Sequence, residues 1–157
     1  MLYYTNLYFQ GRRFLMKLTK EEIKTAMAKN GVAWDHRDLE GVLEIYHNDV
    51  YFENWTGGQA KGKEALRQAW TSWFTSGGKF IFHRDDLFVD EDEQKMTVTW
   101  ELEWPSTEKG YEGKPEKRRG LDVIHFKDGK IFKKLTYSKT TIEIDGQKIK
   151  LTTQTSS

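Results

Sequence analysis

Apolar and polar positions follow a helical spacing in the first half of the chain and a two-residue alternation in the second. In the first half, Thr19 followed by Glu22 is a capping-box pattern, in which each side chain bonds to the other's backbone at a helix start. A first helix is therefore predicted to begin here, with Ile23 and Met27 on its apolar side. It is predicted to end at the Asn-Gly pair at 30–31.

Two further helices flank a short strand. Asp38 is the predicted N-cap of the second helix, which should end near His47, because apolar side chains recur every three or four positions between them. The β-branched and aromatic residues at 50–55 predict a strand, and a glycine-rich turn follows it. A third helix is predicted from Lys63 to Phe74, with Ser-Gly-Gly at 76–78 as its end.

The rest of the chain has the composition of β-strands. Strands are predicted at 79–89, 95–104, 118–126 and 131–144, with turns at 90–93, 105–115 and 127–129. In the second of these strands apolar and polar residues alternate, so one face packs on a core. This order indicates the α+β class: a cone-shaped curved antiparallel sheet packed against three N-terminal helices, with a pocket inside the cone.

Composition and charge narrow the range of functions. The chain has 157 residues, with 25 Lys and Arg against 24 Asp and Glu, so no overall field favours nucleic acid or an anionic membrane as a partner. It has no cysteine, which excludes disulfides and thiolate metal sites. The four histidines show no metal-binding spacing and there is no phosphate-binding glycine loop, so neither metal nor cofactor is expected. With no long apolar segment, a cytoplasmic location is expected.

The first residues differ from the rest of the chain. The sequence Asn-Leu-Tyr-Phe-Gln-Gly at 6–11 resembles the recognition sequence of a viral protease used to remove tags. Residues 1–15 are therefore interpreted as the remnant of an expression tag. Residues 16–157 are predicted to form one domain, because a chain of this size buries about 70% of the surface that its unfolded form exposes.

Two segments together resemble a known family. Residues 35–70 contain an acid-capped helix, an acidic turn, a short strand and a Gly-basic-Glu-Ala helix start, and residues 121–131 contain a Phe, Asp-Gly, Lys-Ile hairpin. This order is similar to the SnoaL-like and ketosteroid-isomerase-like branch of the nuclear-transport-factor-2-like superfamily. The resemblance spans nearly all of residues 17–145 and implies the cone-shaped fold. It does not select an activity, because the family includes isomerases, polyketide cyclases, dehydratases and epoxide hydrolases beside proteins with no catalytic role.

For the isomerase branch, the resemblance implies three polar positions inside the cone. The acid on a later strand corresponds to Asp122, the base at the end of the first strand to Asn54, and the tyrosine on the first helix falls near Asn30. Asparagine cannot abstract a proton at neutral pH and lacks the acidity of tyrosine. The resemblance therefore assigns the functional acid to Asp122 and leaves the isomerase mechanism without its base.

Asp122 and His83 are the candidate catalytic residues. If Asp122 points inward among apolar neighbours, it is suited to act as a general acid or to stabilise an oxyanion; the alternative is an ion pair with Lys134. His83 is suited to proton transfer near neutral pH, and the alternative is a hydrogen-bonded histidine on the sheet surface. Asn54 either orients a ligand or caps the turn that follows it, and a register shift of one residue would bring Glu53 inward instead.

The other candidate pocket residues are aromatic or belong to the last long strand. The predicted ligand-binding residues are Asn54, Phe52, Trp55, Trp100, Lys134 and Thr136. Phe132 is predicted to share the pocket face with the last two, whereas Ile131, Leu135 and Tyr137 lie on the outer side, whose apolar surface indicates a homodimer. The basic segment 114–119 contains a glutamate and no aromatic residues between its charges, so it is interpreted as a solvated loop.

Two functional hypotheses follow. The first is a domain that binds a small apolar or polycyclic molecule, with cofactor-free acid-base catalysis of the isomerase, cyclase or dehydratase kind. The second is a non-catalytic ligand-binding or dimeric assembly domain on the same scaffold. They differ in whether Asp122 lies in an enclosed cavity with a second proton-transfer group nearby.

Overall fold

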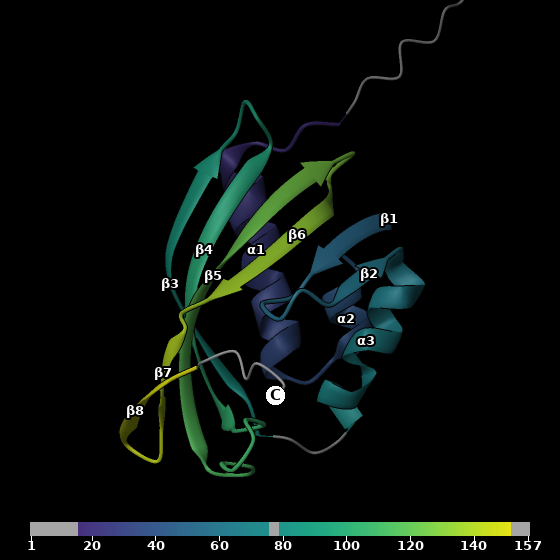
Figure 1. Cartoon of the computed structure of the whole chain (residues 1–157). Coiled ribbons are helices and arrows are strands. Elements are labelled where there is room, and N and C mark those ends of the chain that lie inside the picture. The colour runs from purple at the N-terminus through teal and green to yellow at the C-terminus, as the bar shows by residue number, and fades with distance from the viewer. Residues whose placement is uncertain (1–15, 76–78, 152–157) are drawn as a thin grey trace, which may run out of the picture.

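The computed structural model describes residues 16–75 and 79–151, which form helices followed by strands (Figure 1). The helices are α1 (Lys20–Asp35), α2 (Leu39–Leu43) and α3 (Lys63–Thr75). The strands are β1 (Tyr46–Glu53), β2 (Gln59–Lys61), β3 (Ile81–Asp90), β4 (Lys95–Pro105), β5 (Pro115–Lys127), β6 (Lys130–Ser138), β7 (Thr141–Ile144) and β8 (Gln147–Lys150). This order confirms the predicted α+β class. The predicted tag at 1–15 and the helix end at 76–78 lie outside the described residues.

The sheet curves around the helices. Its strand order is β2-β1-β6-β5-β4-β3, and β7 and β8 form a hairpin beside β5. The neighbours from β6 to β3 are antiparallel, as predicted, whereas β1 runs parallel to β6 and makes the sheet mixed. Figure 1 shows the three helices on the concave side of the long strands. Among the residues described, no helix combines the length and the apolar character needed to cross a membrane.

The first helix begins where predicted and continues further. Thr19 and Glu22 form the capping box, but the helix runs through the predicted stop at 30–31 to Asp35. The Asn30 side chain donates to the Val42 carbonyl at 2.8 Å, so it joins α1 to α2 and does not end the helix. Gly31 is buried against Arg84, where a Cβ atom would lie 3.4 Å from the guanidinium. The guanidinium of Arg84 therefore packs against this turn of the helix at an ordinary contact distance.

Long-range pairing explains the other differences from the predicted elements. The second helix ends at Leu43, and β1 begins already at Tyr46, which pairs with Ile131 of β6. The strand predicted at 131–144 is divided, because β6 pairs with β5 as far as Ser138 and β7 pairs with β5 near Glu116. Neither β2 nor β8 was predicted, and both are too short for a pattern of their own.

The alternation predicted for the strand at 95–104 is confirmed in β4. Met96, Val98, Trp100 and Leu102 are buried, and the residues between them are more exposed. Trp100 lies against Gly120 of β5, where any side chain would meet the indole ring. The absence of a side chain at this position lets the ring lie across the concave face of the sheet, where the cavity described below is found.

A bulge between β5 and β6 changes which residues of β6 face inward. The register shifts after His125, and the fully buried Ile131 joins the core. Phe132 is not on the pocket face as predicted; it contacts His47 ring to edge and lies under Lys127. Beyond the bulge the prediction holds, because Thr136 is buried and Tyr137 is half exposed. A local two-residue alternation cannot anticipate an extra residue in the strand.

The segment predicted as a solvated loop at 114–119 instead includes the start of β5, where buried and exposed side chains alternate. Glu116 and Arg118 are almost fully inaccessible, with the Arg118 Nε atom 2.8 Å from Glu116 Oε1. A second carboxylate, that of Glu108, lies 2.6 Å from the same guanidinium. Trp104 Nε1 and Ser106 Oγ donate to the two Glu116 oxygens at 2.8 and 2.7 Å. The prediction failed because these charges satisfy one another inside the protein, which composition does not reveal.

Candidate ligand-binding cavity

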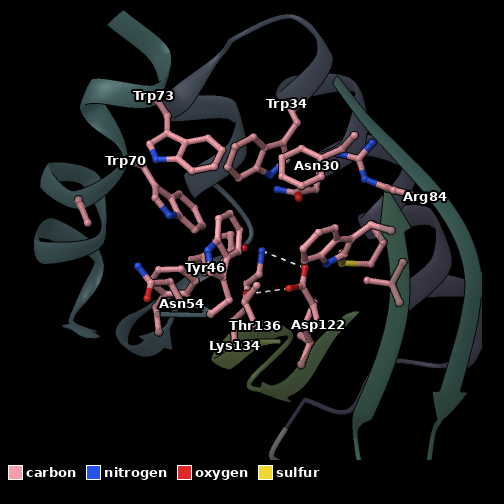
Figure 2. A pocket seen from close by; sticks show the side chains of 18 residues that line it. Asn30, Trp34, Tyr46, Asn54, Trp70, Trp73, Arg84, Asp122, Lys134 and Thr136 are labelled. Atoms are coloured by element: carbon pink, nitrogen blue, oxygen red, sulfur yellow. Dashed lines mark hydrogen bonds and ion pairs between the residues drawn. The ribbon is translucent and has the colours of Figure 1, made fainter. Parts of the chain in front are cut away.

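A cavity of about 140 Å³ lies between the concave face of the sheet and helices α1 and α3. Aromatic rings form most of its wall, and polar side chains gather at one side (Figure 2). Its lining consists of Met27, Asn30, Trp34, Tyr46, Phe52, Asn54, Trp55, Ala69, Trp70, Trp73, Phe82, Arg84, Val98, Trp100, Asp122, Ile124, Lys134 and Thr136. All the predicted ligand-binding residues therefore border one space.

Asp122 faces the cavity and accepts two polar contacts. Its Oδ1 atom accepts a hydrogen bond from Thr136 Oγ1 at 2.7 Å, and its Oδ2 atom lies 3.1 Å from Lys134 Nζ (Figure 2). The strand alternation that predicted an inward Asp122, on the same face as Ile124 and Phe126, is confirmed. Both features that were to separate the two hypotheses are present, because Asp122 borders a cavity and is also paired with Lys134.

Lys134 is a buried cation surrounded by aromatic rings. Burial lowers the pKa of Lys134, but the Asp122 carboxylate and the Tyr46 side chain raise it, and the net pKa lies above the ordinary value of lysine. Arg84 opposes this increase because it carries a like charge. The ammonium also lies 5.5 Å from the centre of the Trp70 ring and 5.9 Å from that of Phe52, within the range of cation–π attraction. Lys134 is therefore a protonated donor at neutral pH, and it is not a base.

Tyr46 is the tyrosine that lines the cavity. In the sequence analysis it fell within the span predicted for the second helix. It is 2% exposed, and burial raises the pKa of its phenol, which stays protonated at neutral pH. Asn30, the position that the resemblance implied for a tyrosine, also lines the cavity, with its amide nitrogen committed to Val42. Tyr46 shares the inward face of β1 with Val50 and Phe52, so an earlier strand start would have revealed it.

Arg84 was also missed, and it lines the cavity from the strand on which sequence reasoning considered His83. Phe82 and Arg84 line the cavity from β3. Strand alternation sends His83 between them to the opposite face, where its Nε2 atom lies 3.1 Å from Glu103 Oε1 and half of its side chain is exposed. The prediction of a proton-transferring His83 in the cavity is therefore wrong, and the alternative of a hydrogen-bonded surface histidine is confirmed.

Asn54 lines the cavity from the end of β1, with Glu53 on the other side of the strand. The side-chain oxygen of Asn54, Oδ1, accepts hydrogen bonds from the backbone nitrogens of Thr56 at 3.0 Å and Gly58 at 2.8 Å, which confirms that Asn54 caps the turn. Glu53 instead accepts a hydrogen bond from Tyr51. The register shift that would have made Glu53 a base is absent from β1 as the structure describes it.

The aromatic wall is made by side chains from both layers. Trp34 lies on α1 and Trp70 on α3, and their ring centres are 5.1 Å apart in an edge-to-face arrangement. Trp55 connects this wall to the sheet, because its ring centre is 5.9 Å from that of Trp100. Within residues 16–75 and 79–151 there is no group of three His, Asp or Glu side chains suited to hold a metal ion.

The sequence and the fold were compared with those of known proteins. Residues 29–134 match the family model of the SnoaL-like domain. The chain is similar to an ntf2-like protein of unknown function from Mesorhizobium loti, at 21% identity and a TM-score of 0.60 over 76% of this chain and 92% of that one. No curated protein matches the sequence.

Two further solved structures share the fold, one of an enzyme and one of a designed binding protein. SalBIII, an epoxide hydrolase/cyclase-like enzyme of pyran ring formation in salinomycin, is 18% identical, with a TM-score of 0.67 over 79% of this chain and 96% of SalBIII. A computationally designed 17-OHP binder is 20% identical, with a TM-score of 0.64 over 80% of this chain and 98% of the binder. The family match covers more than half of the sequence, and the chain therefore belongs to the SnoaL-like domain family.

Proposed function

We propose that this protein binds a small, largely apolar molecule in the cone and orients it by an oxygen atom. The observation that carries the proposal is a wall of aromatic rings closed at one side by Tyr46, Lys134 and Asp122. Flat rings supply apolar contact area, and a few convergent polar groups set the orientation of a ligand. The designed relative that binds 17-OHP supports the use of this scaffold for an apolar molecule.

The size of the cavity favours a ligand with one ring. Its volume of about 140 Å³ is close to that of an engineered apolar cavity of about 150 Å³ that binds benzene. The sequence-based expectation included polycyclic molecules, which require the rim to open further. We therefore propose a single-ring molecule as the ligand of the form described here.

The polar side of the cavity favours an oxygen acceptor on that ring. Lys134 is a charged donor. The Tyr46 hydroxyl makes no hydrogen bond to the described residues, and it is not among fully buried polar atoms that lack a partner, so it remains accessible. The oxygens of Asp122 are already occupied by Thr136 and Lys134. A carbonyl, phenolate or carboxylate oxygen therefore finds donors here, whereas a ligand donor finds few free acceptors.

The second candidate function is cofactor-free acid-base catalysis. The observation that favours it is that a carboxylate, a neutral phenol and an ammonium border the same small space. In this version Asp122 acts as a base and not as the acid predicted from sequence, because one of its oxygens accepts a hydrogen bond from Thr136 and the other is paired with the Lys134 ammonium. Tyr46 and Lys134 would stabilise the oxyanion that forms when a proton leaves the carbon beside a carbonyl group.

We also propose that the protein is a homodimer that pairs through the outer face of the sheet. Leu121 pairs with Tyr137 across β5 and β6, and Val123 pairs with Leu135. These side chains form a partly apolar surface, on which Tyr137 is half exposed. Ile131, which sequence reasoning added to this surface, belongs to the core and takes no part in it.

Filling the cavity should abolish ligand binding. Val98→Phe places a ring in the cavity, so we expect para-cresol to bind at least tenfold more weakly to this variant than to the wild type, as measured by quenching of tryptophan fluorescence. Val123→Phe is the matched control, because it adds the same ring to the outer face of the neighbouring strand. Equal binding by both variants, with native circular dichroism, would place the ligand outside the cone.

The charged state of Lys134 should be visible in the pH dependence of stability. In the wild type the raised pKa of Lys134 contributes stability below its unfolded value of about 10.4, and this stability is lost only as the pH rises through the folded pKa. Asp122→Asn removes the main group that raises this pKa, and burial then lowers it. The unfolded chain of the variant binds more protons than the folded chain, so its stability rises with pH.

We therefore expect the Asp122→Asn variant to lose about 3–5 kcal/mol of unfolding free energy at pH 7, from urea denaturation, and to recover part of this loss by pH 9.5. The double variant Asp122→Asn with Lys134→Met is the control, and its deficit should not change with pH. A deficit that is the same at both pH values in the single variant would show that Lys134 is not held as a buried cation.

Proton exchange separates binding from catalysis. If Asp122 is a base, the wild type should accelerate deuterium incorporation into the methyl ketone group of para-methylacetophenone in heavy water, followed by proton NMR. Asp122→Asn should reduce the rate by at least tenfold while the ketone still binds. Equal exchange with and without the wild-type protein, at saturating ketone, would remove the catalytic candidate and leave the binding function.

A charge on the outer face should dissociate the dimer. Tyr137→Glu is expected to convert a dimer into a monomer in sedimentation experiments, because an ionised carboxylate would be buried without a partner. Val32→Glu is the control, since Val32 is an exposed apolar residue on helix α1, on the concave side of the sheet. A wild-type monomer at micromolar concentration, or a dimer that both variants leave intact, would contradict this interface.

A further inference from the structure

The charged side chains that line the cavity do not balance. Two of them, Arg84 and Lys134, are cations, and Asp122 is the only acid among the lining residues of the described chain. Asp122 is committed to Lys134, at 3.1 Å. Arg84 therefore supplies one positive charge in excess at the border of a largely aromatic space.

Arg84 has no strong partner among the residues that the structure describes. Its Nη1 atom lies 3.7 Å from Asp35 Oδ1, and the Asp35 side chain is 61% exposed. At that distance and exposure an ion pair contributes little to stability. Among residues 16–75 and 79–151 the guanidinium donates no hydrogen bond within normal range, although it carries five N–H groups. The side chain is 32% exposed, so its N–H groups are open to solvent and to a ligand and are not committed to the described residues.

The backbone is shaped to hold Arg84 at the cavity. The pairing of β3 with β4 shifts between Arg84 and Leu87, which marks a bulge directly after the arginine. Bulges of this kind redirect side chains and are frequent next to binding sites. On the facing helix, the guanidinium packs against Gly31. Figure 2 shows Arg84 on the side of the cavity where Asn30 lies, with the Asp122–Lys134 pair opposite.

Both cations act on the same region of the cavity. Tyr46 is within electrostatic range of Arg84 and of Lys134, and each of them opposes the increase that burial causes in the pKa of the phenol. Arg84 likewise lowers the pKa of Lys134. These effects are those of like charges facing one space, and an anion bound between Arg84 and Tyr46 would relieve the repulsion.

We propose that the ligand is a small aromatic monoanion, whose carboxylate binds Arg84 and accepts a hydrogen bond from Tyr46 while its ring packs among the tryptophans. This inference rests on the proposed binding function of the same cavity and names the chemical class of its ligand. The planar guanidinium matches a carboxylate through two parallel hydrogen bonds, which is the geometry that a lysine cannot provide. A neutral ligand would leave the Arg84 donors unused, and a cation would be repelled.

Two matched probes test the charge of the ligand. Para-toluate and para-toluamide have the same ring and nearly the same shape, but only the first is an anion at pH 7.5. We expect the wild type to bind para-toluate at least tenfold more tightly than para-toluamide in fluorescence or calorimetric titrations, since hydrogen bonds to charged groups are worth about 1.5–3 kcal/mol.

Arg84→Met should remove this preference by weakening para-toluate alone, and binding of para-toluamide shows that the variant is folded. Arg119→Met is the control, because Arg119 is exposed on the outer face of β5. Arg84→Gln serves as a second variant that keeps a polar group if the methionine form does not fold.

Two results would overturn the proposal. Equal affinity of the wild type for both probes would show that the cavity has no preference for an anion, while binding of para-cresol would still support the proposed function. A preference that survives both Arg84 substitutions would assign the carboxylate to Lys134. Failure of para-cresol and both toluyl probes to bind would instead contradict the proposed function itself.

Discussion

The ion pair between Asp122 and Lys134 is the constraint on which the cavity depends. A lysine placed among Trp34, Phe52 and Trp70 cannot stay charged without a partner, because the desolvation of an isolated ammonium is costly. Asp122 supplies that partner from the neighbouring strand. Because Asp122 stands opposite Thr136 in the ladder, the pair also requires one register of β5 against β6. The same contact therefore keeps a charge inside the cone and aligns the two strands that form its floor.

The inward face of β5 changes in character along its length. Glu116 and Arg118 form a buried ionic group at the start of the strand, Asp122 forms a second one in the middle, and Ile124 and Phe126 complete an apolar core at the end. Gly120 separates the two ionic groups and admits the Trp100 ring between them. Arg118 also lies over the Trp55 ring, at 5.2 Å from its centre. The Glu116–Arg118 group thus packs against the aromatic wall through Trp55, whereas Asp122 lines the cavity itself.

Local patterns in the sequence predicted those features of the structure that depend on residues close together in the chain. The capping box at Thr19, the alternation in β4 and the inward direction of Asp122 depend on spacing within one element, and the structure agrees with them. The cavity roles of Tyr46 and Arg84 depend on distant partners. Tyr46 joins a strand because Ile131 pairs with it, and Arg84 lies beside a register shift between β3 and β4 and packs against Gly31 of α1.

An anionic ligand and a basic Asp122 place opposite demands on the cavity. An anion at Arg84 neutralises the like charge that acts on Lys134, which strengthens the hold of Lys134 on the Asp122 carboxylate. Asp122 is then less available to accept a proton from the ligand. A neutral carbonyl compound leaves the positive charge of Arg84 without a counter-ion. Arg84 then continues to repel Lys134, which weakens the Asp122–Lys134 pair. The proposed binding of an aromatic acid therefore fits the resting charges, whereas the proposed catalysis by Asp122 requires a substrate that draws Lys134 away.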